Sequence, residues 1–183
     1  IIMGELSLDG GLQPIKGALS IAIKAKEEGF KGIILPFQNV KEAAIVDGID
    51  VYGVENVLQV IHFFEGVESL IPTKIDTTAE FSRTLDFPEH DFSDVKGQES
   101  IKRCMEIAAA GGHNIILIGP PGSGKTMLAK RLPSILPPMT MREALETTKI
   151  HSVAGKTKDV GLMAQRPFRS PHHTASSVSL VGG

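Results

Sequence analysis

Hydrophobic and polar residues follow two different periods in the first 70 residues, and these periods predict helices and strands in turn. Apolar residues recur every three or four positions over residues 17–28, with lysines and glutamates between them, which indicates an amphipathic helix ended by Gly29. A second helix is expected over residues 55–64. Short apolar runs predict strands over residues 5–8, 31–36 and 49–54. Strands that alternate with helices favour a small α/β domain over residues 1–70.

Residues 71–91 break this alternation, because prolines, threonines and acidic residues interrupt any helical or strand period. We expect an extended linker here and place the domain boundary in it. Three apolar residues indicate that the linker docks on a neighbouring part of the chain: Phe81, Leu85 and Phe87.

Helical and strand periods of hydrophobic residues are found again in residues 92–183, and they predict a second α/β domain. The first expected elements are a helix, a strand of β-branched residues, a loop and a helix, over residues 98–110, 113–118, 119–124 and 125–132. A further helix is predicted from Met141 to about Thr148, with Thr140 as its N-cap and Glu143 placed for a capping box. Residues after 150 are expected to form a hairpin and loops.

Composition is that of an ordinary globular protein, with 42% hydrophobic and 22% charged residues. The longest apolar runs are strand-sized, far below the roughly 20 residues that cross a bilayer, so no membrane partner is expected. The single cysteine, Cys104, excludes an internal disulfide and favours a reducing, cytoplasmic location.

The charge is distributed unevenly between the two halves of the chain. Residues 1–91 carry 7 basic and 15 acidic side chains, whereas residues 92–183 carry 12 and 6, which gives −8 and +6. A basic half can attract phosphates or nucleic acid, and this half contains the motif described next.

Residues 119–126 fit the pattern G-x-x-x-x-G-K-[ST] at every fixed position. Glycines in such a loop let successive backbone N–H groups point at phosphate oxygens, and the following helix adds its positive dipole end. A lysine at the position of Lys125 reaches the β- and γ-phosphates of ATP, and the hydroxyl of Thr126 is expected to ligate Mg²⁺. The predicted binding residues are Gly119, Pro120, Pro121, Gly122, Ser123, Gly124, Lys125 and Thr126.

ATP hydrolysis by such a loop also needs an apolar strand that ends in an acidic residue, which holds Mg²⁺ and polarises water. None of the acidic residues after Thr126 ends an apolar run. We therefore expect this chain to bind ATP and Mg²⁺ with negligible turnover, and we assign no catalytic residue in it. Because the sequence pattern stops at Gly182 and Gly183, we expect a piece of a longer protein.

Two segments around the loop resemble a known family. Asp94-Val95-Lys96-Gly97-Gln98 resembles the start of an AAA+ module, and Arg166-Pro167-Phe168-Arg169-Ser170-Pro171-His172-His173-Thr174 is similar to the R-P-F-R-x-P-H-H-T stretch of magnesium-chelatase-like AAA+ ATPases of the ComM (YifB) type. The resemblance implies a partial AAA+ domain over residues 92–183, with Val95 near the adenine.

The same resemblance implies a function for the longer protein. It implies a hexameric motor in which ATP hydrolysis drives DNA branch migration during recombination and natural transformation. A magnesium-chelatase-type ATPase that drives metal insertion into a porphyrin is the alternative. A nucleotide-dependent scaffold that never hydrolyses ATP also stays open.

Residues 1–70 resemble the C-terminal part of a Lon-like domain. Gly4-Glu5-Leu6-Ser7-Leu8 and Leu12-Gln13-Pro14-Ile15-Lys16-Gly17 match segments of the proteolytic domain of Lon. In that register Leu19 occupies the place of the catalytic lysine. Leucine can neither deprotonate a serine nor stabilise its alkoxide, so a peptidase function is disfavoured.

Four polar residues near the end have several possible roles. Arg166 and Arg169 are candidates for contact with DNA phosphates or with the nucleotide of a neighbouring subunit, or are solvated loop arginines. Adjacent histidines on a strand point to opposite faces, so His172 and His173 favour a structural or DNA-facing loop over a metal site.

Overall fold

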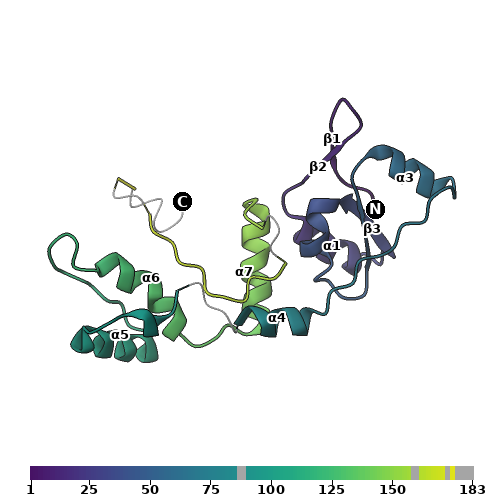
Figure 1. Ribbon diagram of the computed structural model, residues 1–183. Coiled ribbons are helices and arrows are strands. Elements are labelled where there is room, and N and C mark those ends of the chain that lie inside the picture. Colours follow the sequence, from purple (N-terminus) through teal and green to yellow (C-terminus); the bar gives the residue numbers. More distant parts are fainter. Residues whose placement is uncertain (86–89, 158–160, 172–173, 176–183) are drawn as a thin grey trace. The chain divides into compact units, whose positions relative to one another are not determined.

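The computed structural model describes residues 1–85, 90–157, 161–171 and 174–175 (Figure 1). The chain forms two compact units. Unit 1 contains Ile1–Phe87 and Met139–Ala164, and unit 2 contains Pro88–Pro138 and Gln165–Gly183. Both helices and strands are present, so the predicted mixed α/β class is confirmed. The units differ from the expected domains 1–70 and 92–183 in two respects: unit 1 also contains residues 71–87, which were expected to be part of a linker, and residues 139–164.

Unit 1 begins with an antiparallel hairpin of β1 (Glu5–Leu6) and β2 (Leu12–Gln13). A pair of parallel strands follows, β3 (Gly32–Pro36) and β4 (Asp50–Val54), in a register that aligns Ile33 with Val51. The helices of the unit are α1 (Ala18–Glu27), α2 (Val40–Ala43), α3 (Val57–Phe64), α4 (Thr77–Leu85) and α7 (Met141–Val153), with a short 3₁₀ turn at Phe37–Asn39.

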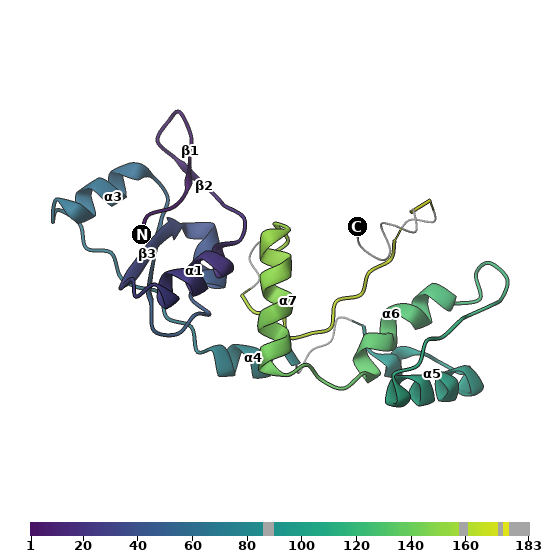
Figure 2. The ribbon, with the colours of Figure 1, turned by 180° about the vertical axis from the view of Figure 1, so that it is seen from behind.

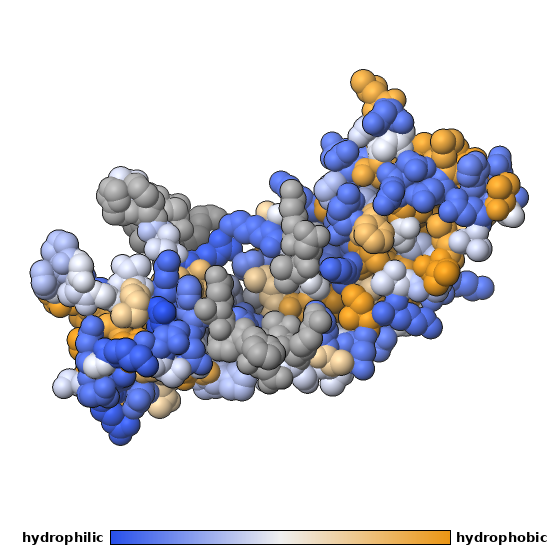
Figure 3. Space-filling model, viewed as in Figure 1, coloured by the Kyte–Doolittle hydropathy of each residue, from blue (hydrophilic) through white to orange (hydrophobic). Residues whose placement is uncertain are grey.

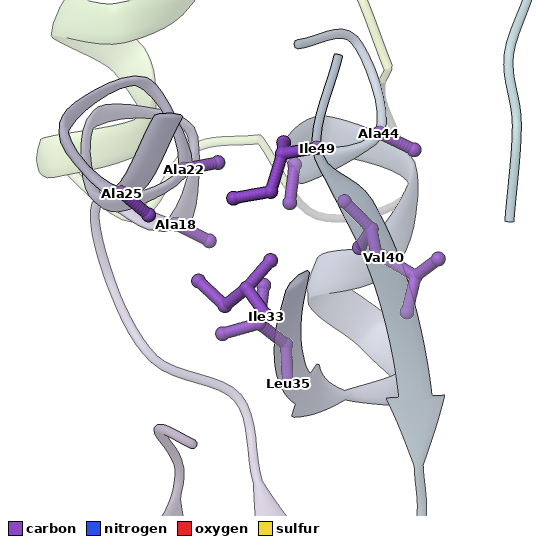
Figure 4. Close-up of a cluster of buried hydrophobic side chains, with 10 residues drawn as sticks. Ala18, Ala22, Ala25, Ile33, Leu35, Val40, Ala44 and Ile49 are labelled. Atoms are coloured by element: carbon purple, nitrogen blue, oxygen red, sulfur yellow. The ribbon is translucent and has the colours of Figure 1, made fainter. Parts of the chain in front are cut away.

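The core of unit 1 lies between α1 and β3. Ala18, Ala22 and Ala25 lie on one face of α1 and point toward Ile33 and Leu35 of β3 (Figure 4). All five side chains are buried. Alanines spaced four and three residues apart allow the helix to approach the strand closely, so the periodicity read from residues 17–28 corresponds to the buried face.

The prediction of an extended linker over residues 71–91 is wrong for its middle, because α4 occupies Thr77–Leu85. Asp76 caps this helix: its Oδ1 accepts hydrogen bonds from the backbone N–H groups of Thr78 and Ala79, both at 3.0 Å. The expected docking is present at Phe81, which packs on a buried cluster of unit 1. Phe87 lies outside the described residues.

Unit 2 contains a 3₁₀ turn at Phe92–Asp94, α5 (Glu99–Gly111) and α6 (Lys125–Ile135). The predicted strand over residues 113–118 is not formed: residues 113–120 have no regular structure. A strand needs a neighbour to bond its N–H and C=O groups, and none of the described residues pairs with this segment. Ile116 and Ile118 are 82% and 87% exposed as a result.

Helix α7 forms as its cap sequence predicts, although it extends to Val153. Thr140 Oγ1 accepts from the N–H of Glu143, and the Glu143 carboxylate accepts from the N–H of Thr140, which completes the capping box. Figures 1 and 2 show α7 next to α1 from opposite sides.

Apolar side chains reach the surface of unit 1 over α3 and at the tip of the β1–β2 hairpin (Figure 3). Leu58, Ile61 and Phe64 of α3 are 59%, 44% and 66% exposed. Grouped exposed apolar residues are typical of surfaces that contact another polypeptide segment. Within the described residues, no helix has both the length and the apolar character needed to cross a membrane.

Candidate phosphate-binding site

The loop of residues 119–124 connects residues 113–118, which have no regular structure, to the first residue of α6, Lys125. Gly122 and Gly124 have left-handed backbones, with φ of +79° and +84°, and Gly124 is the N-cap of α6. A residue with a Cβ is strained in this region of φ and ψ, so glycine at both positions is a requirement of the turn. Gly124 is a fixed position of the sequence pattern, whereas Gly122 lies at one of its variable positions.

The side chain of Lys125 lies across the loop. Its Nζ donates to the carbonyl oxygens of Gly119 at 2.8 Å and Pro120 at 2.6 Å, and to Ser123 Oγ at 3.2 Å. The ammonium group is therefore held directly over the turn by the loop's own oxygens. A fixed positive charge in this place suits an anionic ligand better than a neutral one.

The beginning of α6 supplies the remaining features of an anion site. The first backbone N–H groups of a helix have no partner within it, and its dipole places a partial positive charge there. Thr126, in the first turn, is exposed. Backbone donors, one ammonium group and one accessible hydroxyl fit a phosphate chain with its metal ion.

Both ends of the loop are anchored in one hydrophobic cluster. Leu117 precedes the loop and Leu128 follows it, and both pack with Phe92, Val95 and Met105. Leu128 and Met105 are each 1% exposed, so α6 is fixed on α5 at this point. The loop is thus held by buried contacts, although its own residues are mostly exposed.

Polar contacts tie the segment before Val95 to α6. Arg131 Nε donates to the carbonyl oxygen of Asp91 at 3.1 Å, and Ser134 Oγ accepts from the N–H of Phe92 at 2.9 Å. The Asp91 carboxylate accepts hydrogen bonds from the backbone N–H and side chain of Ser93, which lower the pKa of Asp91 below its ordinary value. These contacts fix Val95 relative to α6.

Val95 itself is 2% exposed and belongs to the cluster beneath α6. Its contact with adenine stays a prediction. Gln98 was not among the predicted site residues, yet its amide lies beside the loop: a Cβ added to Gly124 would be 3.5 Å from Gln98 Nε2. Gln98 has φ of +57° and is the one non-glycine residue with positive φ in the described chain. Its position in the segment 94–98 was the available signal.

Of the other predicted residues, Arg166 and Arg169 lie within the described part of the chain. Arg166 Nε donates to the carbonyl oxygen of Pro137 at 2.9 Å, and Arg169 is exposed. His172 and His173 lie outside the described residues. Among those that are described, no group of three or more His, Cys, Asp or Glu side chains could hold a metal ion.

Two family models match the chain. The model of magnesium chelatase, subunit ChlI, matches residues 91–183, and that of subunit ChlI of Mg-chelatase matches residues 1–39. The chain therefore belongs to the magnesium chelatase ChlI family, an AAA+ ATPase-like group.

Within this family, the chain is similar along its whole length to two bacterial proteins. YifB of Escherichia coli is 44% identical over 182 residues, which are 100% of this chain and 35% of YifB. Competence protein ComM of Haemophilus influenzae is 41% identical over 186 residues, 99% of this chain and 35% of ComM. The resemblance to the ComM type is confirmed, and the chain spans about a third of the length of these relatives.

Part of the chain is also similar to a Lon protease. An archaeal Lon protease of Methanothermobacter thermautotrophicus is 34% identical over 82 residues, which cover 45% of this chain and 13% of that protease.

Proposed function

We propose that the chain binds ATP together with Mg²⁺ through residues 119–126. The observation that carries this proposal is the position of Lys125 Nζ, held over a glycine turn at the beginning of α6. Lys125 would neutralise the β- and γ-phosphates, the backbone N–H groups of the loop would bind phosphate oxygens, and Thr126 would contribute its hydroxyl to Mg²⁺.

Cleavage of a phosphate bond of ATP would supply energy to the longer protein. The residues of this chain would bind and orient the ATP. We further propose that the longer protein is a hexameric, cytoplasmic ATPase that acts on branched DNA. The similarity to competence protein ComM and the net charge of +6 in residues 92–183 support this proposal. Residues 1–183 lack a second acidic motif, so negligible turnover is expected of them.

The test uses a longer protein that includes the sequence after Gly183, purified with and without Lys125→Ala. Wild-type protein should hydrolyse ATP and move a branched DNA junction, and the variant should lose both activities. Lys130→Ala, on the exposed side of the same helix, is the matched control and should retain them. Branch migration that is unchanged by Lys125→Ala would contradict the proposal.

The second candidate is an ATPase that drives metal insertion into a porphyrin, which the name of the matching family favours. Residues 1–70 argue against it, because a Lon-like domain is expected in the ComM type and not in a dedicated chelatase subunit. ATP-dependent formation of magnesium porphyrin, together with no effect on DNA junctions, would favour this candidate instead.

A further inference from the structure

The segment Met139–Ala164 has an unusual path through the fold. It follows Pro138 of unit 2, packs in unit 1, and is followed by Gln165 of unit 2. We call it the docking arm, and we propose that it tethers the phosphate-loop unit to the N-terminal unit, with Glu42 as the polar latch that holds it. This inference goes beyond nucleotide binding and is tested without nucleotide.

Apolar side chains of the docking arm pack against residues of the N-terminal part of unit 1. Leu19 of α1 and Ile45, both from the N-terminal part, share one cluster with Met139, Ala144 and Leu162 of the arm. All five side chains are buried, and Leu19 and Ala144 have no exposed surface. Removal of this much apolar surface from water favours the docked position.

Glu42 supplies a polar contact next to this cluster. Its side chain is buried, with 4% of the residue exposed. Oε1 accepts from the backbone N–H of Leu19 at 3.1 Å and from Ser152 Oγ of the arm at 2.9 Å, and Oε2 accepts from Thr157 Oγ1 of the arm. No ion pair involves Glu42 within the described part of the chain.

A buried carboxylate without a cation is costly unless hydrogen bonds replace its hydration. Two of the three donors to Glu42 come from the docking arm. On release of the arm, water would hydrate the carboxylate in their place, so Glu42 favours the docked position by the net strength of these two charge-assisted hydrogen bonds. The backbone N–H of Gly17 adds a bond to the carbonyl oxygen of Ser152 at 3.1 Å.

Hydrogen bonds also connect residues within the docking arm. Thr148 is fully buried; its Oγ1 donates to the carbonyl oxygen of Ala144 at 2.7 Å and accepts from the N–H of Met163 at 2.9 Å. Thr148 thus joins α7 to the returning chain at Leu162–Ala164. Between the last residue of α6, Ile135, and the arm, the chain contains Pro137 and Pro138, which make a short connection stiff.

The experiment measures hydrogen exchange by mass spectrometry on the 183-residue chain without nucleotide. Glu42→Ala should accelerate exchange in residues 141–157 at least about tenfold, the effect of losing one hydrogen bond to a charged group. Exchange in β3 should change much less. Glu146→Ala is the matched control, since this carboxylate lies on the exposed side of α7 and pairs with Arg142; it should leave exchange unchanged.

Arm-side variants keep the test decisive if Glu42→Ala fails to fold. Ser152→Ala with Thr157→Val should produce the same acceleration, and adding Glu42→Ala should increase it little, because the three groups act as one unit. Unchanged exchange, additive effects, or equal acceleration in β3 and the arm would overturn the proposal.

Discussion

At the scale of single residues, Gly122 and Gly66 form a natural pair, because their backbones are alike and their places in the fold differ. Their φ values are +79° and +73°, and a Cβ added to either meets no atom within 4 Å. Gly122 lies in the phosphate loop, whereas Gly66 follows α3 in unit 1. Any difference between their alanine variants therefore reports on the loop's function rather than on crowding.

We predict that Gly122→Ala and Gly66→Ala each lower the free energy of unfolding by about 1 kcal/mol, the cost of a left-handed alanine. Gly122→Ala alone should weaken ATP binding, because it changes the direction of the loop's N–H groups. Chemical denaturation and calorimetry provide the two readouts. Equal ATP affinity for both variants would show that the backbone of Gly122 plays no part in binding phosphate.

The loop residues can be proposed from sequence because their chemistry is local: the glycines and Lys125 lie within a stretch of eight residues. Val95 is different, since its burial under α6 depends on Met105 and Leu128, which lie elsewhere in the chain. A resemblance suggested a contact with adenine, but periodicity alone gave no sign that Val95 is a core residue. Gln98 is exposed and was missed although it lies in the same segment 94–98.

At the scale of elements, β4 and α2 are in unusually close contact at Gly53. A Cβ added there would lie 2.5 Å from Val40 Cγ2, and Val40 is buried. We predict that Gly53→Ala destabilises the chain by about 1–3 kcal/mol through overpacking. Combining it with Val40→Ala should cost clearly less than the sum of the two single changes. Strict additivity in chemical denaturation would show that the two residues are not coupled.

Strands 31–36 and 49–54 and helix α7 were predicted from sequence, whereas the strand over residues 113–118 and helix α4 were not predicted correctly. The capping box of Thr140 and Glu143 marked the start of α7 correctly, because both groups lie in one turn. Residues 113–118 have the β-branched composition of a strand but no paired neighbour among the described residues, so composition alone predicted the wrong state. Asp76 caps α4 within residues 71–91, which were predicted to be an extended linker because prolines and threonines interrupt any period there.

At the scale of the whole molecule, the sequence placed one boundary between two domains, whereas the chain passes between the two compact units at residues 87–88, 138–139 and 164–165. The capping-box residues Thr140 and Glu143 predict that a helix begins at Met141. This local signal does not show which unit provides the partner surface, because that depends on residues such as Leu19 and Glu42 that lie far away in the sequence.

The basic second half leads to a prediction about DNA. In the longer protein, binding to branched DNA should weaken steeply with salt, because bound phosphates release counterions. Arg166→Ala with Arg169→Ala should reduce the slope of log affinity against log salt by about 2 if each contacts a phosphate. Arg103→Ala with Arg142→Ala removes the same charge from arginines that pair with Glu106 and Glu146. The same slope in both double variants would assign Arg166 and Arg169 to structure.

Calorimetric titration of the 183-residue chain with ATP and Mg²⁺ tests the phosphate-binding site itself. We predict saturable binding that Lys125→Ala weakens sharply, since the variant loses the charge held over the loop. Circular dichroism should show that both proteins are equally folded, and Lys130→Ala should bind like the wild type. Equal affinity for ATP in the wild-type chain and in Lys125→Ala would contradict the assignment of residues 119–126 as the nucleotide site.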